Sequence, residues 1–152
     1  MDNHVTIVIP SLNPSADFPS YCATLRKATD APILIVDDGS RPDCAEIFSD
    51  CVHAGDNISV IRHEVNRGKG RALKTAFAKL LENPDMTGCV TCDSDGQHTP
   101  PDVLRCIREL EANPKAFVLG CRTFNLENVP WKSRFGNTTM CTLFKLVTGR
   151  VI

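Results

Sequence analysis

The sequence lacks three features that mark other classes of protein. Its longest apolar runs, such as "ILIV" at 33–36, have the length of a strand and fall far short of the ~20 residues that a membrane-spanning helix requires. The 17 basic residues are matched by 18 acidic ones, so no basic excess is present to neutralise phosphates, and we expect no nucleic-acid partner. The N-terminus "MDNHVTIVIP" has neither the basic segment nor the long apolar core of a signal peptide, which predicts a cytoplasmic location.

The eight cysteines show neither the spacing of a disulfide framework nor that of a zinc site. In a reducing cytosol they are expected to be thiols, most of them small buried residues. Cys89 and Cys92 form the one CxxC pair, whereas a structural zinc site generally needs a second pair or two suitably spaced histidines. A thioredoxin-like CxxC opens a helix, but this pair lies in an apolar run that is typical of a strand. Both cysteine functions are therefore disfavoured.

Short apolar runs alternate with longer segments of helical periodicity along the chain. The length of 152 residues predicts one domain with a substantial core. We expect strands at 5–10, 32–40, 58–63, 88–92 and 116–122, and helices at 21–28, after residue 40, at 70–83, at 100–113 and after residue 131, with a long loop at 123–133. This alternation predicts right-handed βαβ units and hence an α/β fold, a Rossmann-like sandwich with a mainly parallel sheet.

Two of the expected helices carry specific local predictions. Ser40 and Asp43 have the spacing of a capping box, which predicts a helix that is capped by Ser40. The buried face of this helix would consist of Ile47, Phe48 and Cys51. In the helix at 70–83, one apolar stripe is expected to be buried: Leu73, Ala76, Phe77, Leu80 and Leu81.

Polar segments follow three of the expected strands: "PSLN" after the first, "DDGS" after the second and "DSDGQH" after the fourth. In open α/β sheets, ligands bind beyond the carboxyl ends of the strands. Taken singly, Asp37 or Asp38 is equally well explained as a helix cap or a turn former. Their occurrence together with the other two segments predicts a binding site at this edge of the sheet.

Asp93 and Asp95 form a DXD motif, in which two carboxylates are separated by one residue. In an extended segment both would project to the same side, and a cation between them would relieve their repulsion. Carboxylate and amide oxygens suit hard ions, so we expect Mg²⁺ or Mn²⁺. Gln97 would add a neutral oxygen if the alternation continues through Gly96; the alternative is an exposed loop glutamine.

The segment "NRGKGRALK" at 66–74 superficially resembles a phosphate loop. A Walker A motif needs a lysine after its last glycine, whereas Lys69 lies between the two glycines. What remains is a glycine-rich turn before a helix N-terminus, with positive charge from Arg67, Lys69 and Arg71. Such a place favours anions, and the alternative is a solvated helix entry without a ligand.

Taken in order, "IPSLN", "VDDGS", "NRGKGRALKTAF", "DSDGQH" and "LGCR" resemble segments of the nucleotide-diphosphosugar glycosyltransferases of the GT-A fold, family 2 type. The likeness is closest to the inverting polyprenyl-phosphate mannosyl- and glucosyltransferases of the dolichol-phosphate mannose synthase type. It covers nearly the whole chain, and the five segments keep the order and the approximate spacing of that family. The five segments together are specific to this family, whereas each segment alone is weak evidence for it.

The resemblance implies specific roles for residues in these segments. Asp95 and Arg122 would be catalytic, Asp95 through the metal and Arg122 at the diphosphate or the acceptor phosphate. The metal would be bound by Asp93, Asp95 and Gln97. The nucleotide of the donor would be met by Pro10, Leu12, Asn13, Asp37, Asp38, Lys69 and Asp93. The chain departs from the family at "SLN", where many members have an aromatic residue and a glutamate.

The resemblance also implies an activity, which is the inverting transfer of a hexose from a GDP- or UDP-sugar to a polyprenyl phosphate or a saccharide, as in cell-envelope polysaccharide synthesis. A divalent ion would neutralise the diphosphate leaving group. The oxygen of a lipid phosphate is already anionic, so it needs little help from a general base, and a guanidinium suits the task of holding it. The parent protein is expected at the cytoplasmic face of a membrane.

The chain ends at "LVTGRVI", before the acceptor-side segment that such enzymes usually carry. We therefore expect residues 1–152 to be a single catalytic domain that is truncated at its C-terminus. The first alternative is a fragment that binds a nucleotide sugar without turnover. A receiver-like phosphoacceptor domain is disfavoured because its acid pair would close the first strand, and a nucleotidyltransferase would need a glycine-rich, arginine-bearing loop after that strand.

Overall fold

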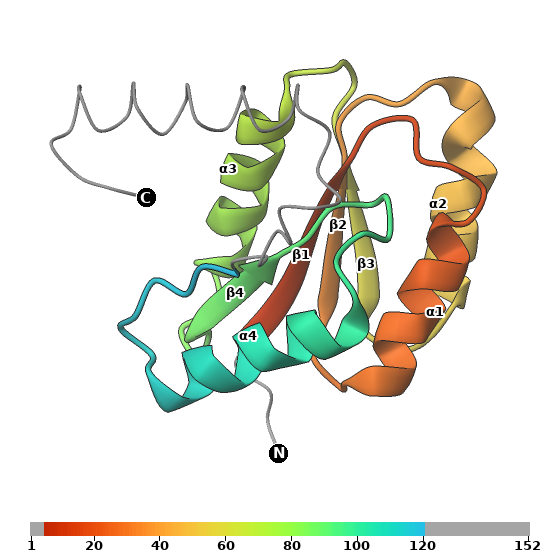
Figure 1. The fold of residues 1–152 in the computed structure, drawn as a ribbon. Helices are drawn as coiled ribbons and strands as arrows, with labels where there is room; N and C mark the ends of the chain where they lie inside the picture. The colour runs from red at the N-terminus through yellow and green to blue at the C-terminus, as the bar shows by residue number, and fades with distance from the viewer. Residues whose placement is uncertain (1–4, 121–152) are drawn as a thin grey trace, which may run out of the picture. The chain divides into compact units, whose positions relative to one another are not determined.

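The computed structural model describes residues 5–120 of the chain, and in them four strands alternate with four α-helices (Figure 1). In chain order they are β1 (Val5–Ser11), α1 (Phe18–Ala28), β2 (Ile33–Asp37), a 3₁₀ turn η1 (Pro42–Cys44), α2 (Ala45–His53), β3 (Ile58–Arg62), α3 (Lys69–Leu80), β4 (Gly88–Thr91) and α4 (Pro100–Ala112). All strand pairs are parallel. The predicted α/β fold with a mainly parallel sheet is therefore confirmed.

The four strands follow the order β3-β2-β1-β4 across the sheet. The chain moves outward from β1 through β2 to β3 and then returns to the other side of β1 with β4. The order therefore reverses between β1 and β4, and a crevice outside the carboxyl ends at such a switch point is the usual ligand site of an open α/β sheet.

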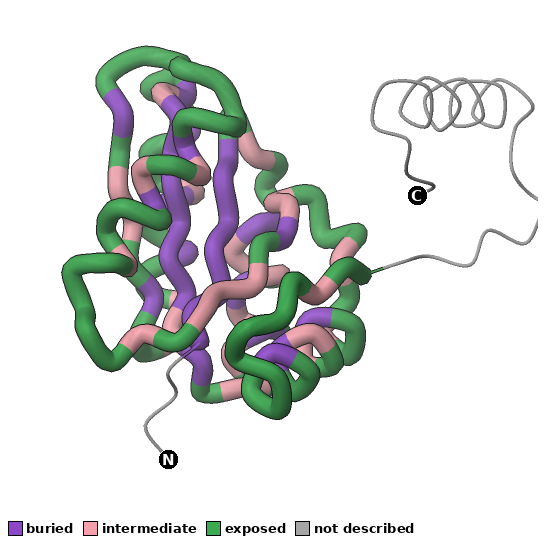
Figure 2. Tube along the Cα trace, turned by 90° about the vertical axis from the view of Figure 1, so that its left-hand side faces the viewer, coloured by how far each residue is buried: buried purple, intermediate pink, exposed green. Residues whose placement is uncertain are grey.

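Both faces of the central strands are buried, and for this reason their sequences are continuously apolar (Figure 2). Alternate residues serve opposite faces. Ile7, Ile9 and Ile35 belong to the core cluster that includes the buried residues of α1, α2 and α4, whereas Val8 and Val36 pack with α3. Figure 1 shows α3 on one side of the sheet and α1 and α2 on the other.

The apolar stripe predicted for α3 is partly wrong. Ala76 is fully buried, as expected, but the other fully buried residue is Ala72, which lies one turn earlier. Phe77 is 39% exposed and Leu81, just beyond the end of the helix, is 83% exposed. The face that meets β1 and β2 is built on small alanines, and they allow the helix backbone to approach the sheet closely.

The capping box predicted at Ser40 is also wrong. The Ser40 hydroxyl accepts a hydrogen bond from the backbone N–H of Asn13 at 2.9 Å, so it joins two loops instead of capping a helix. The 3₁₀ turn comes first, and α2 begins only at Ala45. Of the residues predicted to be buried, Phe48 and Cys51 are confirmed, whereas Ile47 is only partly buried.

The fifth strand predicted at 116–122 is not formed over 116–120. An apolar run satisfies the side-chain preference of a strand, but a strand also requires a neighbouring backbone, and within the described residues β4 is the last strand on its side of the sheet. Residues 121 and 122, the loop at 123–133 and the helix after residue 131 lie outside the described residues. Within 5–120, no helix combines the length and the apolar character that a membrane crossing needs.

Candidate functional site

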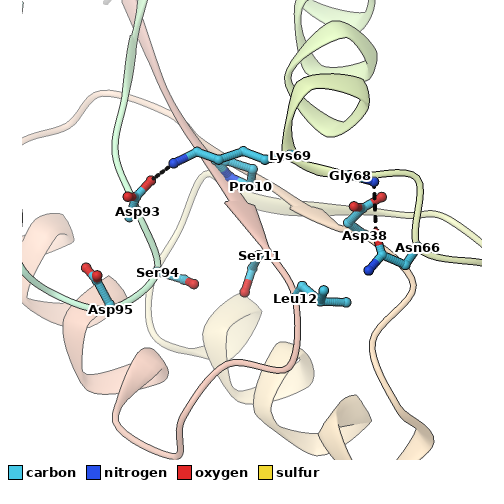
Figure 3. A pocket seen from close by; sticks show the side chains of 10 residues that line it. All are labelled: Pro10, Ser11, Leu12, Asp38, Asn66, Gly68, Lys69, Asp93, Ser94 and Asp95. Atoms are coloured by element: carbon cyan, nitrogen blue, oxygen red, sulfur yellow. Dashed lines mark hydrogen bonds and ion pairs between the residues drawn. The ribbon is translucent and has the colours of Figure 1, made fainter. Parts of the chain in front are cut away.

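A cavity of about 290 Å³ lies at the carboxyl ends of β1, β2 and β4 (Figure 3). The pairing of β1 with β2 continues to Ser11, whereas its pairing with β4 stops at Val8. The end of β1 therefore has a sheet neighbour on one side and the cavity on the other. The lining residues come from four segments of the chain: Pro10, Ser11, Leu12, Asp38, Asn66, Gly68, Lys69, Asp93, Ser94 and Asp95.

Asp38, directly after β2, is held in one orientation by buried hydrogen bonds. Its Oδ1 atom accepts from His63 Nδ1 at 2.7 Å and from the backbone N–H of Arg67 at 3.0 Å. Nε2 of His63 lies 2.9 Å from Thr75 Oγ1 on α3. Burial raises the pKa of Asp38, but the hydrogen bonds from His63, Arg67 and Gly68 outweigh burial, so this pKa lies below its usual value. The cavity therefore contains a fixed, negatively charged carboxylate at neutral pH.

Asp37, the last residue of β2, does not line the cavity. Its Oδ1 atom accepts the backbone N–H of Ser40 at 2.8 Å, and its Oδ2 atom lies 3.4 Å from Arg62 Nη1. Only 1% of the residue is exposed. These contacts connect β2 with β3 and the following turn, and the role at the donor base that the sequence suggested for Asp37 stays a prediction.

Lys69, at the start of α3, meets the loop that follows β4 (Figure 3). Its Nζ atom lies 2.5 Å from Oδ1 of Asp93, and the two side chains are 62% and 41% exposed. An ion pair that is this exposed contributes little to stability, about 0–1 kcal/mol. Lys69 is therefore available to an anion that enters the cavity, and Asp93 to a cation.

Asp93 and Asp95 both line the cavity, although the segment that carries them is not extended as predicted. Residues 94 and 95 form a turn, and Gly96 has a φ of 74°. Oδ1 of Asp95 accepts the backbone N–H of Gln97 at 3.0 Å. Because the alternation ends at this turn, Gln97 is exposed and is not among the lining residues. The structure thus brings together two of the three residues expected at the metal.

The oxygen atoms of Asp93 and Asp95 suit a hard divalent cation. Mg²⁺ is usually bound through one or two carboxylates together with the phosphates of a substrate and water. Among residues 5–120, no group of three or more His, Cys, Asp or Glu side chains is placed to hold a metal. A cation at these two carboxylates would therefore need ligands from the bound substrate.

Pro10 and Leu12 line the cavity, as expected of the first loop, but Asn13 does not. Asn13 has a φ of 50°, and its Oδ1 atom accepts the backbone N–H of Arg41 at 2.9 Å, while its own N–H donates to Ser40. These bonds tie the loop after β1 to the loop after β2. Asn13 thus holds two loops of the site together without lining the cavity, and its contact with a nucleotide stays a prediction.

Four lining residues were not predicted individually as site residues: Ser11, Asn66, Gly68 and Ser94. Each lies within one of the polar or glycine-rich segments, but only the backbone direction decides which of its neighbours faces the cavity. Tyr21 on α1 is a further contributor, because its hydroxyl donates to the carbonyl of His98 at 2.6 Å and so anchors the loop after β4. No local motif marks Tyr21 either. Arg122 lies outside the described residues.

The cysteines that the structure describes are free thiols. Burial raises the pKa of Cys89, and it raises that of Cys92 to about 11. Both are therefore protonated at neutral pH, whereas thiol exchange requires the thiolate.

Comparison with known proteins assigns the family. Residues 6–148 match the model of the family described as Glycosyl transferase family 2. An uncharacterised protein of Methanocaldococcus jannaschii is 31% identical over 97% of this chain and 59% of its own length. The UDP-N-acetylglucosamine–dolichyl-phosphate N-acetylglucosaminyltransferase of Methanococcus voltae is 27% identical over 97% of this chain and 64% of its own. An undecaprenyl-phosphate 4-deoxy-4-formamido-L-arabinose transferase of Enterobacter sp. (strain 638) is 30% identical over 97% and 45%.

The chain spans less than two thirds of the length of each of these relatives. Its parallel sheet with helices on both faces agrees with the Rossmann-like GT-A fold that the resemblance implied. Since the family match extends over residues 6–148, the chain belongs to glycosyl transferase family 2.

Proposed function

We propose that this chain is the donor-binding part of an inverting glycosyltransferase, which moves a hexose from a GDP- or UDP-sugar to a polyprenyl phosphate. The observation that carries the proposal is the convergence of Asp38, Lys69, Asp93 and Asp95 on one cavity from three separate segments of the chain. A nucleotide sugar contains a nucleoside with hydrogen-bond donors, a diphosphate and an uncharged sugar. The cavity offers a carboxylate for the donors of the nucleoside and a lysine for the charge of the diphosphate.

The nucleoside would lie toward Asp38, because a fixed carboxylate accepts hydrogen bonds from base N–H or ribose hydroxyl groups and repels phosphate. The diphosphate would lie toward Lys69, at the N-terminus of α3, where positive charge and helix N–H groups favour anions. Asp37 and Asn13 would support this arrangement through the loops that they connect.

Asp93 and Asp95 would hold Mg²⁺ or Mn²⁺ against the diphosphate. Such a cation would neutralise the charge that develops on the leaving group. Lys69 would then exchange its contact with Asp93 for one with a phosphate oxygen, and Asp93 would be released toward the cation or the ribose. Asp95 would keep its hydrogen bond with the Gln97 backbone during this exchange. Gln97 is the third ligand that the resemblance implies for the metal.

The acceptor is proposed from the names of the relatives, one of which acts on dolichyl phosphate and another on undecaprenyl phosphate. A phosphate oxygen attacks as an anion, so this chain would not need a general base. Arg122 would hold the acceptor phosphate through paired N–H groups. A single in-line displacement would invert the anomeric carbon. The free thiols of the described cysteines suit the cytoplasm as the compartment of the reaction.

Calorimetric titration of the 152-residue chain with UDP and with GDP, each in Mn²⁺ and then in EDTA, tests donor binding. We expect one nucleotide to bind in Mn²⁺ and to bind much more weakly in EDTA. Binding of neither nucleotide would contradict the proposal.

The alternative of binding without turnover needs a separate measurement. Incubation of the chain with the preferred nucleotide sugar and undecaprenyl phosphate, followed by mass spectrometry of the lipid, detects transfer directly. A glycosylated lipid phosphate excludes the binding-only alternative for this chain. Nucleotide binding without such a product supports that alternative.

A further inference from the structure

The loop at 93–98, between β4 and α4, carries Asp93 and Asp95, the two carboxylates that the proposed function assigns to the metal. The chain enters this loop from Cys92, whose backbone N–H donates to a carbonyl of β1 at 3.0 Å. It then turns at Gly96, which has a φ of 74°. Because the loop is short and sharply bent, the place of its carboxylates depends on what holds the turn.

Tyr21 of α1 contacts this loop on both sides of the turn (Figure 1). Its hydroxyl donates to the carbonyl of His98 at 2.6 Å. Its ring lies close to Gly96, because a Cβ atom added to that glycine would be 3.9 Å from Cδ2 of Tyr21. Burial raises the pKa of Tyr21, and the neighbouring Cys92 thiol raises it further, so the hydroxyl remains a proton donor at neutral pH. One side chain thus supports the loop before, at and after its turn.

The helix that carries Tyr21 gives it a rigid base. Phe18, Cys22 and Leu25 of α1 are at most 1% exposed and belong to the large core cluster. Tyr21 itself is half-buried and packs against the same cluster. A side chain that is already fixed by packing loses little conformational freedom when it holds a neighbouring segment.

The ion pair between Lys69 and Asp93 is a less permanent support, since Lys69 would turn to a phosphate when the donor binds. Tyr21 does not line the cavity, so its contacts with the loop are independent of the ligand. A Mg²⁺ ion demands near-ideal ligand geometry, and its affinity therefore depends on where the carboxylates are held. We propose that Tyr21 is a positioning residue that holds the 93–98 loop, and with it Asp95, where the cation binds; this inference rests on the proposed function.

Tyr21→Phe removes only the hydroxyl and keeps the ring. This variant should bind nucleotide in EDTA as wild type does, and in Mn²⁺ it should lose about tenfold in affinity, the lower end of the usual loss when a group that orients a metal ligand is removed. In the ligand-free chain, the backbone amides at 93–98 should exchange hydrogen faster. A hydroxyl that serves only the fold would lower the melting temperature without changing the ratio of the two affinities.

The experiment measures the affinity of wild type, Tyr21→Phe and Thr24→Val for UDP and GDP by calorimetry, in Mn²⁺ and in EDTA, and their hydrogen exchange without ligand by mass spectrometry. Thr24 is the matched control, because its hydroxyl also donates from α1 to a backbone carbonyl, at 2.8 Å, but to that of Ser20 in the same helix. We expect Thr24→Val to bind nucleotide, and to exchange at 93–98, like wild type.

The outcomes separate this inference from the proposed function. Wild type that binds nucleotide in a metal-dependent way, together with an unchanged affinity of Tyr21→Phe in Mn²⁺, overturns only the role of Tyr21. An equal loss in Mn²⁺ and in EDTA overturns it as well, because the loss is then not tied to the metal, and so does unchanged exchange at 93–98. A wild-type chain that binds no nucleotide, or binds it equally with and without metal, overturns the metal site and this inference together.

Discussion

At the scale of single residues, neighbouring carboxylates have different tasks that depend on their exposure and partners. Asp37 is buried against backbone and arginine partners, Asp38 is buried but lines the cavity, and Asp95 is exposed at the mouth of the cavity. A buried carboxylate with internal partners contributes to stability, whereas an exposed one can be removed at little cost to the fold. Loss of each carboxylate should therefore affect a different measurable property.

Asp95→Ala should abolish metal-dependent nucleotide binding and change the free energy of unfolding by less than about 0.5 kcal/mol, because the side chain is exposed. Titration of the variant with nucleotide and Mn²⁺, together with urea unfolding, checks both parts. Asp50→Ala, which removes an exposed carboxylate from α2, is the control and should bind as wild type does. An unchanged affinity of Asp95→Ala in Mn²⁺ would refute the assignment of Asp95 to the metal.

Asp37→Ala should lower the free energy of unfolding by about 1–3 kcal/mol, because the backbone N–H of Ser40 loses its buried acceptor and Arg62 loses its ion pair. Urea unfolding measures this change. Asp43→Ala is the matched control: its ion pair with Arg41 is exposed on both sides and should be worth less than about 1 kcal/mol. Equal stability of the two variants would contradict the structural role of Asp37.

At the scale of elements, the site depends on two loops whose backbones touch. Gly39, in the loop after β2, has a φ of 75°, and a Cβ atom placed there would lie 2.3 Å from the backbone carbon of Val65 in the loop before α3. Glycine is required here for both the conformation and the close approach. This contact sets the position of α3, and with it that of Lys69, relative to Asp38.

Gly39→Ala should therefore lower the free energy of unfolding by more than about 2 kcal/mol, since strain and backbone overlap add up. Gly70→Ala offers a control of opposite sign. Gly70 lies in the first turn of α3, and a Cβ atom added there would meet no neighbour within 4 Å, so alanine should stabilise the helix by about 0.5–1 kcal/mol. Thermal unfolding of both variants measures the contrast, and a stable Gly39→Ala chain would mean that the two loops are free to separate.

At the scale of the whole molecule, the sequence was sufficient to predict the α/β class and the edge of the sheet that holds the cavity. Both follow from simple periodicity, because carboxyl ends of parallel strands share one edge. Which of Asp37 and Asp38 lines the cavity was not predictable from periodicity, since this depends on where β2 ends relative to β1. The position of Gln97 outside the cavity lining was not predictable either, because the turn at Gly96 interrupts the alternation of side chains. The buried Ser11 hydroxyl has no hydrogen-bond partner within residues 5–120, and no local pattern of the sequence reveals this.

The stability of the whole molecule in acid should depend on Asp38. The pKa of this carboxyl is lower in the folded chain than its usual value of about 3.9. A group of this kind stabilises the fold at pH values above its unfolded pKa, and this stabilisation is lost as the pH falls through the folded pKa. Asp38→Asn cannot titrate, so wild type should be the more stable chain at pH 7, and its advantage should shrink as the pH falls below about 4.

Urea unfolding of both chains between pH 7 and the acid limit of folding measures that difference. The other carboxylates are common to both chains, so their titration largely cancels when the two free energies are subtracted. His63 and Thr75 extend the network of Asp38 to α3, so the same variant should also loosen α3 from the end of β2. A difference that stays constant down to the acid limit would show that Asp38 has the same pKa in both states. The hydrogen bonds from His63 and Arg67 would then not hold it as a carboxylate.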